Sequence, residues 1–198
     1  MEKITSDRRH FCRRLLSAGM LLGVGCPQLL AATQKQQKHK FQMDAKMSFE
    51  QVFMFGCQRP VMLMKALRPQ IGEEKFMKML KETSYKLGEE EGRQMAKGLG
   101  DNSFAAWVAK NKEVDYFGKH VNTGHIVEDT AAAFEMRVSE CLWAKTFREL
   151  EAGDIGYACV CHRGSAIGRG FNPKLKLIRT KNLMQGDDYC QYRWIVEA

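Results

Sequence analysis

The hydrophobic pattern of this 198-residue chain changes its period near residue 121. Before that point, apolar residues such as Phe76, Leu80 and Leu87 recur at helical spacing. After it, apolar and polar residues alternate, which is typical of half-buried antiparallel strands. The expected strands are about 121–128, 134–138, 174–182 and 188–196. The pattern predicts an α+β fold, in which a helical N-terminal half precedes an antiparallel sheet of about four strands with two inserted helices.

Capping residues and prolines set the expected helix ends. Ser48 has capping-box spacing to Gln51, so a helix is expected to begin there. Pro60 and Pro69 interrupt the following stretch, which predicts a short helix over 61–67. Further helices are expected to begin at 72–74, 101–103, Ser139 and Asp154, the last one covering roughly 155–167.

Residues 1–32 have the layout of an export signal. Two adjacent arginines, Arg8 and Arg9, precede an apolar stretch over 15–30. This pattern resembles a twin-arginine signal, so we expect the twin-arginine export machinery as a partner and a periplasmic or other extracytoplasmic location. Cys26 raises the alternative of a lipoprotein anchored at that residue.

The rest of the chain divides into a polar linker over 33–47 and a single α+β domain over 48–198. A domain of this length buries a sizeable core without disulfide bonds. The net charge of the chain is +8, of which residues 1–32 contribute five basic and two acidic side chains. The remaining +5 forms no clustered basic stripe, so we expect no nucleic-acid partner.

Cysteines beyond the export signal are candidates for chemistry. They are Cys57, Cys141, Cys159, Cys161 and Cys190. Their odd number leaves at least one thiol unpaired, and no Cys-x-x-Cys pair indicates a zinc ribbon or a thioredoxin-type site. Cys159 and His162 are three residues apart on an expected helix, which makes them either a thiolate–imidazole pair or ordinary core residues.

Two further groups of polar residues have two interpretations each. Asp187 and Asp188 lie in the loop before the last expected strand, where they are either turn residues or a source of a general base. Arg179 and Arg193 lie on the last two expected strands. Each is either a bidentate carboxylate binder or part of a solvated strand face.

The C-terminal part of the chain contains several distinctive segments. They are SECLWAKTFRE (139–149), DIGYA (154–158), Cys161-His162, FNPKLKLIRTK (171–181), LMQGDD (183–188), Cys190 and Arg193. Over roughly 135–195 the chain resembles the L-2-amino-thiazoline-4-carboxylic acid hydrolase family. The resemblance implies an enzyme without a cofactor that opens a small cyclic amidine or amide bearing a carboxylate.

The resemblance also implies roles for individual residues. It makes Cys161 the nucleophile and places Cys190 in the same site. It assigns proton transfer to His162 or Asp188.

For the substrate, the resemblance implies that Arg179 or Arg193 binds the carboxylate and that Asn172 donates a hydrogen bond to the developing charge. The alternative is a non-catalytic, cysteine-lined binding protein that accompanies an exported redox enzyme. That protein would hold zinc or iron through soft ligands. The ligands in this alternative are Cys141, Cys161, Cys190 and His162.

Overall fold

The computed structural model describes residues 46–113 and 116–197. The expected export signal, including Cys26, and nearly all of the expected linker lie outside the described residues. No helix within the described ranges is long and apolar enough to span a bilayer.

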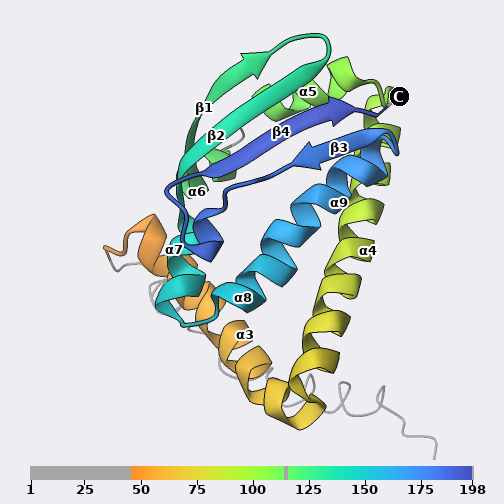
Figure 1. Cartoon of the computed structure of the whole chain (residues 1–198). Helices are drawn as coiled ribbons and strands as arrows, with labels where there is room; N and C mark the ends of the chain where they lie inside the picture. The colour runs from red at the N-terminus through yellow and green to blue at the C-terminus, as the bar shows by residue number, and fades with distance from the viewer. Residues whose placement is uncertain (1–45, 114–115, 198) are drawn as a thin grey trace, which may run out of the picture. The chain divides into compact units, whose positions relative to one another are not determined.

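Four strands form one antiparallel sheet in the order β1-β2-β4-β3 (Figure 1). They are β1 (Asn122–Asp129), β2 (Ala133–Cys141), β3 (Leu175–Ile178) and β4 (Cys190–Val196). Trp194 lies opposite Phe134 on one side and opposite Leu177 on the other, so these three side chains share a face. The predicted α+β fold with a four-stranded antiparallel sheet is confirmed.

Helices form most of the rest of the described chain. They are α3 (Phe49–Ile71), α4 (Glu73–Leu99), α5 (Phe104–Lys112), α6 (Tyr116–Val121) and α7 (Leu142–Glu149), then one continuous helix made of α8 (Gly153–Gly156), the π-helical segment η1 (Tyr157–Cys161) and α9 (His162–Phe171). A 3-10 turn, η2 (Leu183–Gln185), precedes β4. The expected capping box of Ser48 and Gln51 and the expected helix start after Ser103 are confirmed.

The prediction that prolines divide the first helical stretch is wrong. The helix α3 runs through both Pro60 and Pro69. Each proline removes one backbone hydrogen bond, but the inner side of α3 remains packed, with Phe53 and Val61 buried. Packing of this apolar side therefore outweighs the local preference of proline.

The prediction that a helix begins at Ser139 is also wrong. The strand β2 continues to Cys141, which pairs with Asn122 on β1. The hydroxyl of Ser139 donates to the carbonyl of Thr123 across the same pair of strands. Because the ladder with β1 extends this far, α7 begins only at Leu142.

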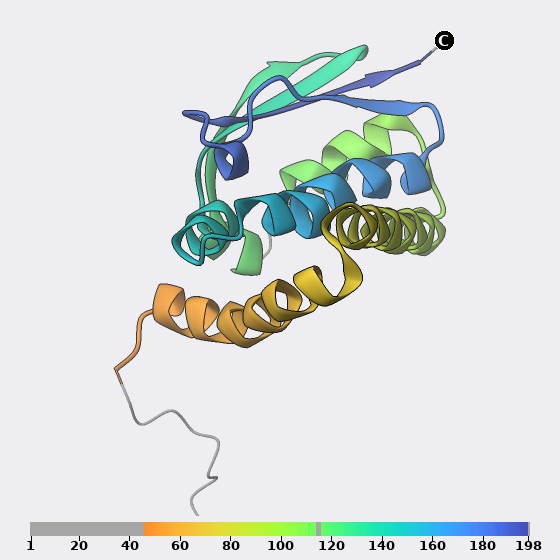
Figure 2. The same ribbon diagram turned by 60° about the horizontal axis from the view of Figure 1, so that its bottom comes forward.

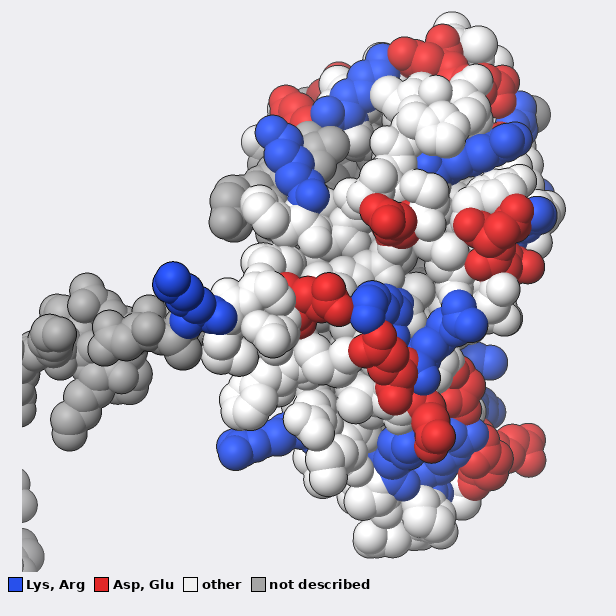
Figure 3. All heavy atoms as spheres, turned by 90° about the vertical axis from the view of Figure 1, so that its left-hand side faces the viewer, with Lys and Arg blue, Asp and Glu red and all other residues white. Residues whose placement is uncertain are grey.

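The helices cover one face of the sheet, as Figure 2 shows. Large side chains from this face and from the helices form a core, in which Trp107 of α5 lies edge-on to Trp194 with ring centroids 4.8 Å apart. The other face is charged. There the guanidinium of Arg193 pairs with Glu128 and lies 3.7 Å from Glu135. The sheet therefore has an inner face that meets the helices and an outer, ion-paired face. Acidic and basic side chains also lie interspersed on the side of the molecule that Figure 3 shows.

The helices α4 and α9 lie side by side in Figures 1 and 2 because glycines remove the side chains at their contact. A Cβ at Gly92 would overlap the carbonyl oxygen of Ile167 and lie 2.6 Å from the amide nitrogen of Phe171. A Cβ at Gly88 would lie 2.6 Å from the carbonyl oxygen of Arg163. This backbone contact fixes the position of α9 and of the π-helical turn that precedes it.

Candidate functional site

Three cysteines from three different elements meet beneath the inner face of the sheet. Cys141 ends β2, Cys161 ends η1 and Cys190 begins β4. Cys161 and Cys190 are only 7% and 2% exposed, and each of the three thiols is close enough to the others to perturb its titration. All of the cysteines in the described part of the chain are free thiols. The fold thus collects residues 49 positions apart in sequence into one thiol cluster.

The π-helical turn determines which cysteines join this cluster. Cys159 and Cys161 both lie in η1, but only Cys161 faces Arg179 and the sheet. Cys159 lies near both Cys161 and Cys57 of α3, in the same apolar core as Cys161, but Arg179 does not affect its titration. Single π-turns inside α-helices are rare and are frequent at functional sites. The sequence predicts an ordinary α-helix over this stretch and does not indicate the π-helical turn.

Asn182 links two of the thiols. Its Oδ1 accepts from the Sγ of Cys161 at 3.7 Å and from the Sγ of Cys190 at 3.8 Å. The same oxygen accepts from the backbone amide of Met184 at 2.8 Å, because Asn182 caps η2. The residue is 1% exposed, and its Nδ2 has no hydrogen-bond partner within the described structure. Sequence reasoning missed Asn182; its capping position before a turn was the available signal.

Arg179 supplies a cation to the thiol cluster. Its guanidinium lies over the ring of Tyr192, 4.4 Å from the centroid, and its Nη1 donates to the carbonyl of Cys161 at 3.0 Å. Its Nε and Nη2 are buried and have no hydrogen-bond partner among the described residues. Arg179 is half-buried, and guanidinium nitrogens that are shielded from water are normally paired, since desolvation without compensation is costly. The free edge of this guanidinium is therefore suited to an anionic ligand.

Burial is the largest cause of the pKa shifts of the three thiols. Desolvation raises the pKa of Cys161 to about 11, against the opposing effects of Asn182 and Arg179. Desolvation also raises the pKa of Cys141 and of Cys190 above the usual thiol value. Near neutral pH the cluster is therefore protonated until something else stabilises a thiolate.

These raised values predict alkaline destabilisation. A thiol whose pKa is higher in the folded than in the unfolded state stabilises the fold below the unfolded pKa. That contribution is lost as the pH rises toward the folded value, here from about 9 to about 11 for Cys161. We expect the urea midpoint to fall across this window and to fall less in a Cys161→Ala variant. An identical fall of the urea midpoint in the unmodified protein and in Cys161→Ala would contradict the raised pKa of Cys161.

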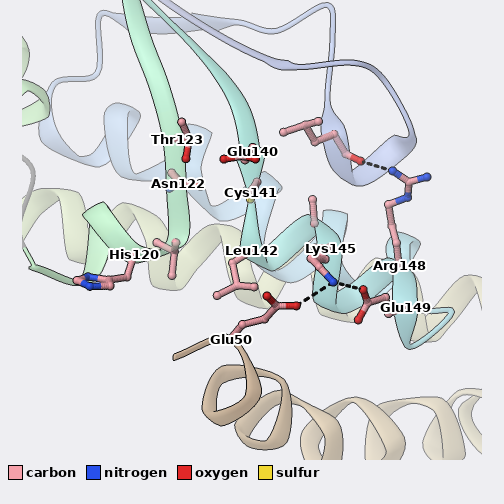
Figure 4. A pocket seen from close by; sticks show the side chains of 13 residues that line it. Glu50, His120, Asn122, Thr123, Glu140, Cys141, Leu142, Lys145, Arg148 and Glu149 are labelled. Carbon is pink, nitrogen blue, oxygen red and sulfur yellow. Dashed lines mark hydrogen bonds and ion pairs between the residues drawn. The ribbon is translucent and has the colours of Figure 1, made fainter. Parts of the chain in front are cut away.

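A cavity of about 760 Å³ opens beside the cluster, with Cys141 in its wall (Figure 4). Cys141 precedes α7 and makes no cap hydrogen bond, but the nearby N–H groups of Ala144 and Trp143 partly oppose the rise in its pKa. Across the cavity, Lys145 forms ion pairs with Glu50 of α3, at 2.9 Å, and with Glu149 of α7. The cavity is therefore polar on one side and reaches a thiol on the other.

Comparison with known families decides what kind of protein carries this site. The family model described as L-2-amino-thiazoline-4-carboxylic acid hydrolase matches residues 34–194. The chain belongs to this family. The match covers the whole described domain up to Trp194, including Cys141, Cys161 and Arg179, and confirms the resemblance inferred from the C-terminal motifs.

Two other comparisons add less to the family assignment. The chain is similar to a trafficking protein particle complex subunit 3 from Naegleria fowleri covalently bound to palmitic acid, with 13% identity and a TM-score of 0.45. That alignment covers 73% of this chain and 96% of the other. No curated protein matches the chain at a significant level.

In this member of the aminothiazoline carboxylate hydrolase family, His162 follows Cys161 at the start of α9. Its ring packs against Tyr85 with centroids 5.3 Å apart. Partial burial lowers the pKa of His162, and the charges of Lys81 and Arg179 lower it further. The imidazole is therefore neutral near pH 7, the form that accepts a proton.

Three other residues inferred from the family resemblance lie away from the thiols. Asp188 is exposed in the loop before β4 and pairs with Lys181 at 2.6 Å, which lowers the pKa of its carboxyl group. Arg193 lies on the outer face of the sheet, in the ion pairs described above. Asn172 ends α9 at its far end, where its Nδ2 donates to the carbonyl of Asn102 at 2.8 Å.

The zinc-or-iron alternative requires a group of ligands at metal distance. Within 46–113 and 116–197, no three or more His, Cys, Asp or Glu side chains are arranged to hold a metal ion. The set Cys141, Cys161, Cys190 and His162 is therefore not assembled as a ligand sphere in this conformation. Metal analysis of the purified protein is the direct test of that alternative.

Proposed function

We propose that this family member hydrolyses a small cyclic amidine that carries a carboxylate, of the 2-aminothiazoline-4-carboxylate type. The name of the family supports the reaction class. The observation that carries the proposal is Arg179, whose two free buried guanidinium nitrogens lie beside thiols instead of beside a carboxylate. A substrate carboxylate completes that bidentate pair.

The thiol that attacks in this proposal is Cys161. Its Sγ lies against Asn182, and its backbone carbonyl is held by Arg179. With a pKa of about 11 it is protonated when the site is empty. A protonated amidine placed beside it would favour the thiolate by direct charge attraction. The substrate itself then activates the nucleophile.

The proposed reaction proceeds in two halves. The Cys161 proton passes to the amidine nitrogen as Sγ adds to the carbon between ring sulfur and nitrogen. The bond from that carbon to the ring sulfur breaks, and the ring sulfur takes that proton. Water then adds to the same carbon, and the bond to Sγ breaks. The sum is substrate plus one water, giving N-carbamoyl-cysteine and the free thiol.

The free Nδ2 of Asn182 is a second group that could assist this reaction. It is a buried donor without an acceptor, which costs roughly 1–3 kcal/mol in the empty site. An acceptor atom on the substrate or the tetrahedral intermediate would satisfy it. Hydrogen-bond donors that already point to the atom where negative charge develops stabilise transition states strongly.

The test is product formation by Cys161→Ser. We expect this variant to lose at least about 10³-fold in kcat/KM for 2-aminothiazoline-4-carboxylate, followed by mass spectrometry of N-carbamoyl-cysteine. Cys57→Ser, on α3 and outside the thiol cluster, is the matched control and should retain full activity. Full activity of Cys161→Ser, or no activity in the unmodified protein, would contradict the proposal.

A non-catalytic binding protein is the second candidate, and the raised thiol pKa values favour it. Protonated thiols are poor nucleophiles but suit a site that only binds a carboxylate through Arg179. The same assay separates the two functions. Binding without product in the unmodified protein would favour the second.

We also propose that the chain is exported. The support is the paired arginines and the apolar stretch within residues 1–32. Export in the folded state would deliver the thiol cluster already buried. An exported redox enzyme as a partner rests on the second candidate function alone.

A further inference from the structure

A second cavity, of about 320 Å³, lies between α5, α9 and the inner face of the sheet. Its wall is mostly apolar and aromatic. Its few polar side chains are neutral, apart from one lysine. The lining residues include Met136, Ile167, Trp107, Trp194, Tyr192 and Gly164. Cavities that bind organic ligands have this composition, with a few placed polar groups.

The cavity adjoins the thiol cluster. Tyr192 lines the cavity and is also the ring over which Arg179 lies. Gly164 lines it as well, and a Cβ there would lie 3.7 Å from Nη2 of Arg179. Tyr192 and Gly164 therefore lie between the cavity and the buried Nη2, which does not itself line the cavity. A ligand whose carboxylate pairs with Arg179 has apolar space on the far side of these two residues.

One lining residue of the cavity has a buried polar group without a partner. Trp107 is 3% exposed, and its indole Nε1 donates no hydrogen bond within the described part of the chain. Buried tryptophan N–H groups usually have an acceptor. No acidic side chain lines this cavity, so its preferred occupant is apolar and carries one neutral acceptor.

We propose that this cavity binds an aryl substituent on the substrate, with a hydrogen-bond acceptor that reaches Trp107. This inference rests on the proposed function, because it places the carboxylate of the same substrate on Arg179. The unsubstituted aminothiazoline ring would leave the cavity unfilled. The preferred substrate class is therefore a cyclic amidine carboxylate with an aromatic group on the ring.

The experiment compares three compounds with the full-length protein. They are 2-aminothiazoline-4-carboxylate, its 5-phenyl derivative and its 5-(4-methoxyphenyl) derivative. We expect kcat/KM to rise by about tenfold with phenyl, since burial of apolar surface adds binding energy, and by a further several-fold with the methoxy acceptor. Titration of Cys161→Ser with each compound should change the fluorescence of Trp107 and Trp194.

Two variants and one control make the test specific. Ile167→Phe narrows the cavity and should abolish the preference for phenyl while sparing the parent compound. Trp107→Phe should remove only the gain from the methoxy group. Trp143→Phe, outside this cavity, should leave all three rates unchanged.

The outcomes separate this inference from the proposed function. Hydrolysis of the parent compound at a rate equal to or above that of both aryl derivatives would overturn the inference and leave the proposed function standing. Hydrolysis of none, with no fluorescence change on titration, would overturn both. Binding of the aryl derivatives that depends on Trp107, without turnover, would support the cavity as a ligand site and contradict catalysis.

Discussion

Arg179→Met is expected to lower kcat/KM for a cyclic amidine carboxylate by about 10²–10³-fold, the loss typical of a removed bidentate charge contact. Stability should change little. The variant loses the hydrogen bond to Cys161 and the contact with Tyr192, together about 1–2 kcal/mol. It also removes two buried, unpaired guanidinium nitrogens, which offsets that loss. The measurements are steady-state kinetics and a urea unfolding curve.

Arg193 provides the matched comparison for this experiment. It is also an arginine of the C-terminal segment, on the central strand β4, but its guanidinium already pairs with Glu128 at 2.8 Å on the outer face. Arg193→Met should therefore destabilise the fold by about 1–3 kcal/mol and leave kcat/KM of the folded protein within about threefold. If Arg193→Met abolished activity while Arg179→Met did not, the carboxylate site would lie on the other face of the sheet.

Gly92→Ala is expected to cause the largest loss of stability from a single methyl group. The new Cβ meets backbone atoms of Ile167 and Phe171 on α9, which have no rotamer to change. The two helices must separate, and we expect a loss of about 3 kcal/mol or more in the free energy of unfolding. Denaturant unfolding followed by circular dichroism measures it.

Gly98 offers a control on the same helix. It lies in α4, and a Cβ there meets nothing within 4 Å. Gly98→Ala should stabilise the protein by about 0.5–1 kcal/mol through the higher helix propensity of alanine. If Gly92→Ala lowers the free energy of unfolding and Gly98→Ala raises it, the close contact between α4 and α9 is the cause of the loss. Equal small effects would mean that α4 and α9 do not pack as closely as described.

The elements that local rules govern were predictable from the sequence. Alternation around Phe134 and Met136 gave the strands, and side-chain caps at Ser48 and Ser103 gave two helix starts. These features depend on residues within a few positions of one another. The helix break that the prolines of α3 predict does not occur, because the burial of Val61 depends on distant parts of the chain.

The candidate site was only partly predictable for the same reason. Motifs identified the cysteines and Arg179, but nothing local distinguished Arg179 from Arg193. The distinction depends on which face of the sheet each occupies, and hence on the strand register. Cys161 joins the cluster through a π-turn, and Asn182 through a 3-10 turn. Neither turn has a hydrophobic period that a sequence pattern reveals.

The burial of the thiol cluster has a consequence for its chemical durability. Peroxides and small disulfides react with thiolates, and the raised pKa of Cys161 and Cys190 keeps both largely in the inert thiol form. Little of either sulfur is accessible to such reagents. In an oxidising compartment the site would stay reduced between encounters with ligand. The same burial that makes Cys161 a weak nucleophile at rest thus protects it from irreversible damage.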